Sequence, residues 1–132
     1  MSQLVTYFMK VKKINQLIAV FFPSLLWATF IFVLSAQEML PGLTLSTADF
    51  ILKKTGHMFV YAVLYWLIVK GFKKSGYKFE RIWLQALVIC VIYAVTDELH
   101  QSAVPGRTAT LRDIGYDLLG ASLVFLSKFG YI

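Results

Sequence analysis

An apolar run near the start of the chain limits what this sequence can fold into. The eighteen residues Leu17 to Leu34, LIAVFFPSLLWATFIFVL, contain no charged side chain. A helix of about 20 mostly apolar residues crosses the hydrocarbon layer of a bilayer, so this run predicts a transmembrane helix. A cleaved signal peptide is the alternative. Its apolar region is usually shorter, about 7–15 residues, and here further apolar segments follow.

The composition agrees with a membrane protein. The 132 residues are 58% hydrophobic and 15% charged, whereas soluble domains contain about 45–50% apolar and about 25% charged residues. A chain of this length predicts a single domain, here residues 1–132. The only cysteine, Cys90, lies inside an apolar run and cannot form a disulfide within the chain.

Three more apolar segments follow the first. The last two are short for a bilayer unless the polar residues beside them belong to the same helices. Polar groups at that depth must face other helices or a water-filled pocket instead of lipid. We therefore expect an all-α membrane protein, with four transmembrane helices in two hairpins, at about residues 17–34, 50–70, 82–101 and 110–127.

The basic residues predict the orientation of these helices, because cytoplasmic segments of membrane proteins are rich in Lys and Arg. With the N-terminus inside, the inner segments carry a net charge of +8 and the outer segments −2, which agrees with the total of +6. Both termini are then cytoplasmic, in a multi-pass protein of the cell membrane. Topology and attraction to anionic lipid explain the positive charge, so we expect no nucleic-acid partner.

Most of the unusual polar residues fall at the outer ends of the expected helices. Asp97 and Gln101 are four residues apart, as are Asp113 and Asp117, so each pair shares one helix face. Ionisable groups are costly inside a membrane and are therefore candidates for function. We expect an outward-facing, extracytoplasmic pocket that contains Ser35, Gln37, Lys54, His57, Asp97, Glu98, Gln101, Arg107, Asp113 and Asp117.

Four members of this set are candidates for catalysis: His57, Asp97, Glu98 and Asp113. Carboxylates in unlike environments, or a histidine oriented by a carboxylate, can transfer protons. The other six are candidates for ligand binding. Among them Arg107 follows a Pro-Gly turn, and its planar guanidinium can bridge carboxylates or hold a phosphate. The competing interpretation is that these charges only anchor helix ends or join helices.

A divalent metal on the carboxylates and His57 is the alternative to a site without a cofactor, because hard cations prefer oxygen ligands. The spacing D-E-x-H is not a known ligand motif, however, so we expect no cofactor. The sequence also has no nucleophile elbow, glycine-rich phosphate loop or zinc motif, which weakens a catalytic interpretation.

Several short motifs resemble the VanZ-like family of bacterial integral membrane proteins. They are S-A-Q after the first apolar run, K-x-x-H in the second, D-E-x-x-Q followed by P-G-R, and D-x-x-x-D-x-x-G in the last. The resemblance covers Ser35 to Gly120. It implies a small membrane protein, and one family member is associated with low-level resistance to the glycopeptide teicoplanin. The family usually carries Asn where this chain has Asp117, which leaves the role of Asp117 open.

These observations favour a protein of the cell envelope that binds or acts on lipid-linked or cell-wall components. Its partners would be the lipid bilayer and a lipid head group, a cell-wall precursor or a glycopeptide. One alternative is a membrane-embedded hydrolase or transferase of phosphate-bearing lipids. Another is a structural bundle that stabilises a larger envelope complex. The sequence leaves open whether there is turnover and how many copies assemble.

Overall fold

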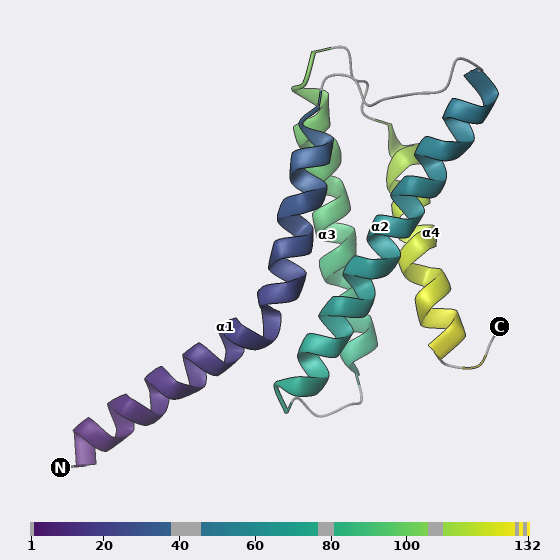
Figure 1. Ribbon diagram of the computed structural model, residues 1–132. Coiled ribbons are helices and arrows are strands. Elements are labelled where there is room, and N and C mark those ends of the chain that lie inside the picture. The colour runs from purple at the N-terminus through teal and green to yellow at the C-terminus, as the bar shows by residue number, and fades with distance from the viewer. Residues whose placement is uncertain (1, 38–45, 77–80, 106–109, 129, 131) are drawn as a thin grey trace.

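The computed structural model describes residues 2–37, 46–76, 81–105, 110–128, 130 and 132, and within them the chain is all-helical. Four helices are present there: α1 (Ser2–Ser35), α2 (Ser46–Lys74), α3 (Ile82–Ser102) and α4 (Leu111–Lys128). Successive helices run in opposite directions, and both chain ends lie toward the same side of the bundle (Figure 1). The predicted all-α fold of four helices is thus confirmed.

Three of the helices, α1, α2 and α3, are long and apolar enough to cross a membrane. The fourth, α4, has 18 residues, and these include four charged side chains: Arg112, Asp113, Asp117 and Lys128. It lies alongside α2 (Figure 1). The chain is a membrane protein on this ground, whereas a membrane-spanning position for α4 stays a prediction.

Helix α1 is longer than the apolar run that predicted it. It has 34 residues and begins at Ser2, whereas the run begins at residue 17. The reason is that residues 2–16 are more polar but contain no Gly or Pro to end a helix. Figure 1 shows α1 changing direction partway along its length. Pro23 lies inside the helix and cannot donate a hydrogen bond to the carbonyl of Ala19, which explains the bend.

Helix α2 is the centre of the bundle, because it contacts all three other helices and most extensively α4. Its Tyr61 and Tyr65 are fully buried. Three residues of α3 that are spaced four apart are small and fully buried: Ala86, Cys90 and Ala94. Small side chains let helices in a membrane approach closely. These three residues belong to the same buried core as the two tyrosines.

Two hydrogen bonds tie the second half of α1 to the bundle. The indole Nε1 of Trp27 donates to the carbonyl of Val60 on α2 at 2.8 Å, and the hydroxyl of Tyr93 on α3 donates to the carbonyl of Ala28 at 2.5 Å. Both acceptors are backbone groups within helices. These bonds fix the depth and rotation of α1 relative to its neighbours.

Helices α2 and α4 approach closely at Gly120 on α4, and this contact generates a test of the fold. A Cβ atom at this position would lie 2.0 Å from the carbonyl oxygen of Met58. Because this neighbour is backbone, Gly120→Ala must push α2 and α4 apart. We expect a loss of about 1–3 kcal/mol or more, as for other overpacked sites, measured as a lower unfolding temperature in detergent.

Gly115→Ala is the matched control. It lies on the same helix, and no atom lies within 4 Å of its added Cβ. Alanine favours a helix over glycine by about 1 kcal/mol, so this variant should be neutral or more stable. Equal unfolding temperatures for the two variants would contradict the packing described.

Candidate functional site

A buried carboxylate, Asp97, joins three helices at the end of the bundle where α1 and α3 finish. Its Oδ2 atom accepts hydrogen bonds from the hydroxyl of Ser35 on α1 at 2.9 Å and from the side-chain amide of Gln101 at 3.2 Å. The hydroxyl of Tyr61 on α2 donates to the same oxygen at 3.4 Å. Gln101 also donates to Ser35 at 3.3 Å. Asp97 itself is 3% exposed, so its carboxylate lies inside the bundle.

A second pair joins α2 to α4. The Nδ1 atom of His57 lies 2.9 Å from Oδ1 of Asp117, which is fully buried. The His57 side chain keeps 20% of its surface exposed. A histidine held at one ring nitrogen by a carboxylate has its other nitrogen available for a ligand or for proton transfer. Asp117 therefore has a partner in this chain.

The start of α4 is held by two further contacts. The ammonium of Lys54 on α2 forms an ion pair with Asp113. The backbone N–H of Asp113 donates to the hydroxyl of Thr110 at 3.3 Å, as expected for an N-cap residue. The backbone N–H of Thr110 donates to Glu98 of α3 at 2.5 Å. The end of α3 is thereby joined to the beginning of α4.

Three carboxylates in this cluster keep an oxygen to which no described residue forms a hydrogen bond. These atoms are Oδ1 of Asp97, Oε2 of Glu98 and Oδ2 of Asp117, and each is buried. The parent side chains are at most 5% exposed. A buried acceptor without a partner costs about 1–3 kcal/mol, and more when it is charged. The cluster therefore has unused capacity to accept hydrogen bonds.

The structure places eight of the ten predicted site residues in these contacts. They come from all four helices, although they are far apart in the sequence. Gln37 lies apart from these contacts: its side chain is exposed, and its amide bonds to the carbonyl of Val33 in its own helix at 3.2 Å. Arg107 lies outside the described residues.

Two residues near the cluster were not in the predicted set. Tyr61 donates to Asp97. Its spacing from Lys54 and His57 predicts that all three share one face of α2, but a tyrosine in such a segment is more often a packing or interface residue. His100 stacks on the ring of Phe32, with centroids 4.1 Å apart, and its buried Nδ1 atom has no partner among the described residues. No sequence signal distinguishes that contact from a solvated histidine at a helix end.

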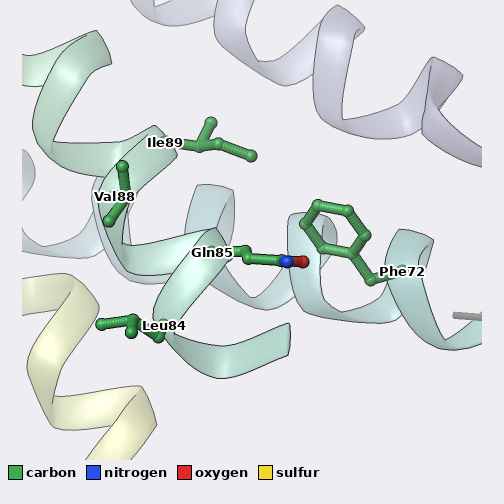
Figure 2. A pocket seen from close by; sticks show the side chains of 5 residues that line it. All are labelled: Phe72, Leu84, Gln85, Val88 and Ile89. Atoms are coloured by element: carbon green, nitrogen blue, oxygen red, sulfur yellow. The ribbon is translucent and has the colours of Figure 1, made fainter. Parts of the chain in front are cut away.

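The described residues contain no group of three or more His, Cys, Asp or Glu side chains arranged to hold a metal ion. They do form a groove of about 450 Å³ at the opposite end of the bundle, where α2 ends and α3 begins. Figure 2 shows the side chain of Gln85 extending toward Phe72 in this groove, with Leu84, Val88 and Ile89 beside it. The groove is therefore separate from the carboxylate cluster.

Comparison with known proteins identifies the family of this chain. The comparisons with curated proteins and with solved structures found no match. The comparison with protein families found the VanZ/LLP1 family, which matches residues 3–129 and so nearly the whole chain. This match confirms the resemblance that the short motifs indicated. The chain is a member of the VanZ/LLP1 family.

Proposed function

We propose that this protein spans the membrane with four helices and binds an envelope molecule at the carboxylate cluster, on the extracytoplasmic side. The observation that carries the proposal is the set of three buried carboxylate oxygens, on Asp97, Glu98 and Asp117, that have no hydrogen-bond partner among the described residues. Such acceptors are stabilised by a ligand that donates hydrogen bonds. Charged groups buried in a membrane bundle destabilise it, so their presence favours a role in binding a ligand.

The charge of the cluster selects the kind of ligand. Among the described residues, the cations near these carboxylates are Lys54, which is already paired with Asp113, and His57 when it is protonated. An ammonium or hydroxyl group would supply the missing donors, whereas a bare phosphate would meet several negative groups. We therefore propose an amine-bearing or sugar-bearing head group, such as that of a cell-wall precursor, or a glycopeptide such as teicoplanin.

A second candidate function is acid–base catalysis, and the contact between His57 and Asp117 favours it. The bond of 2.9 Å holds the imidazole in one orientation and leaves its Nε2 atom for a substrate. A hydrolase or transferase acting on envelope lipids would need such a group. Turnover and binding make different predictions for this histidine.

The proposed orientation, with both termini in the cytoplasm, predicts which residues a thiol-reactive label can reach from outside the cell. With Cys90 replaced by Ala, single cysteines at Lys74 and Ala103 mark exposed positions near opposite ends of the bundle, at the last residue of α2 and just after α3. The excess of basic residues near the start of α1 and near the ends of α2 and α4 predicts that a membrane-impermeant maleimide labels intact cells at residue 103 only. Residue 74 should react only after the membrane is opened. Labelling of both positions in intact cells would refute the four-span arrangement.

Asp97→Asn tests the binding proposal. The amide oxygen of Asn can still accept from Ser35, Gln101 and Tyr61, while its NH₂ group replaces the oxygen that has no partner. We expect folding to persist and affinity to fall about tenfold or more, which matches the loss of one charged hydrogen bond. The measurement is calorimetry of the protein in nanodiscs, with teicoplanin and a lipid-linked cell-wall precursor as separate probes.

The matched control for this experiment is Asp49→Asn. Asp49 is a carboxylate near the start of α2, at the same end of the bundle, and it forms an ion pair of 2.7 Å with Lys53. Its loss removes the same charge and should leave affinity unchanged. Addition of EDTA should also leave affinity unchanged, because we propose no metal. The binding proposal fails if neither probe binds, or if both variants weaken binding equally.

His57→Gln separates turnover from binding. Gln can still donate to Asp117 but cannot transfer a proton between substrate and solvent. If the protein is an enzyme, envelope lipids and cell-wall precursors of cells with this variant should match those of cells without the protein. If it only binds, they should match those of cells with the wild-type protein. Mass spectrometry of the extracts gives the comparison.

A further inference from the structure

The first half of α1 extends beyond what a membrane crossing requires. The helix has 34 residues, which is about 51 Å at 1.5 Å per residue. The hydrocarbon layer is about 30 Å thick and takes about 20 residues. Counted back from Ser35, where α1 meets the carboxylate cluster, a crossing of that length ends near residue 16. Residues 3–14 then lie at or beyond the opposite membrane face.

This segment has one apolar face. Leu4, Tyr7, Phe8, Val11 and Ile14 recur at spacings of three and four residues, which places them on one side of a helix. Leu4, Tyr7 and Phe8 are more than 60% exposed, so the bundle does not cover them. The rings of Tyr7 and Phe8 pack edge to face against each other. The face is therefore available to a partner.

The rest of the segment is basic. Lys10, Lys12 and Lys13 lie outside the apolar face and are exposed. Val5 and Met9 lie among these lysines, so the polar side is not uniformly polar. An apolar face combined with lysines on the other side is the pattern of helices that lie in a membrane interface. The charges match the negative surface of anionic lipids.

The direction of α1 fits a position along the membrane surface. The helix bends near Pro23, and Figure 1 shows its first half leaving the bundle at an angle. A straight continuation would carry apolar side chains into water. An inclined segment can return them to the membrane while its lysines stay among the lipid head groups.

We propose that residues 3–14 bind the surface of the same bilayer as an interfacial helix, with the apolar face in the boundary between head groups and acyl chains. The lysines contact the head groups of anionic lipids. This inference is independent of the ligand proposed for the carboxylate cluster, because it rests on other residues at the other end of the molecule.

The experiment uses the full chain with Cys90 replaced by Ala and a single cysteine at Phe8 or Lys12. Each variant carries an environment-sensitive fluorophore and is reconstituted into vesicles of phosphatidylcholine alone or mixed with phosphatidylglycerol. In the anionic vesicles we expect blue-shifted emission and quenching by lipid-borne quenchers at residue 8. At residue 12 we expect emission typical of water and quenching by iodide.

The triple substitution of Lys10, Lys12 and Lys13 by Gln then tests the role of charge, in the variant labelled at residue 8. It should reduce the burial of that label at least twofold in anionic vesicles. Lys70, Lys73 and Lys74 near the end of α2 provide the matched control, since replacing all three by Gln removes the same charge from the same side of the bundle. That control should leave the label at residue 8 unchanged.

Two results would overturn the proposal. Equal exposure of residues 8 and 12 to iodide would mean that the segment projects into water. Protection of residue 8 that is equal in both kinds of vesicle, together with cross-linking between copies through that cysteine, would mean that a second chain covers the face.

Discussion

The structure depends on the cost of burying carboxylates in a largely apolar helix bundle. Asp97 and Asp117 have almost no exposed surface, and a charge buried in this way must be met by donors from its neighbours. One donor to Asp97 comes from its own helix, from Gln101, and the other partners come from neighbouring helices. Ser35 of α1 and Tyr61 of α2 contact Asp97, and His57 of α2 contacts Asp117. The need for these partners brings the four helices together at one end.

Close packing of α2 and α4 determines the geometry of that end. Gly120 lies against the backbone of Met58, and the residue before Met58 is His57. Asp117 is three residues before Gly120 and so lies on nearly the same face of α4. The absence of a side chain at Gly120 therefore lets the imidazole reach the carboxylate at 2.9 Å. The packing of Gly120 on Met58 and the bond between His57 and Asp117 therefore belong to one interface between α2 and α4.

The sequence predicted the helices better than it predicted their partners. Apolar runs identified four helices, but they gave no signal for residues 2–16 of α1, because a helix can continue through polar residues. The spacing of Asp97 and Gln101 predicted a shared face, and the two side chains are hydrogen-bonded. Ser35 completes this contact from a different helix. Periodicity within a single helix does not specify which helices are neighbours, so the sequence could not predict this bond. The stacking of His100 on Phe32 was missed for the same reason.

The two ends of the molecule have opposite charge and are joined by α1. Ser35 at one end of this helix contacts Asp97, and the lysines at its other end face away from the bundle. A rigid, straight helix could not adjust both ends independently, because rotation at one end would be transmitted to the other. Pro23 interrupts the hydrogen bonding between them, so the half that contains Trp27 can pack on α2 while the first half follows the membrane surface. The bend thus permits one helix to complete a buried polar network and to contact the bilayer.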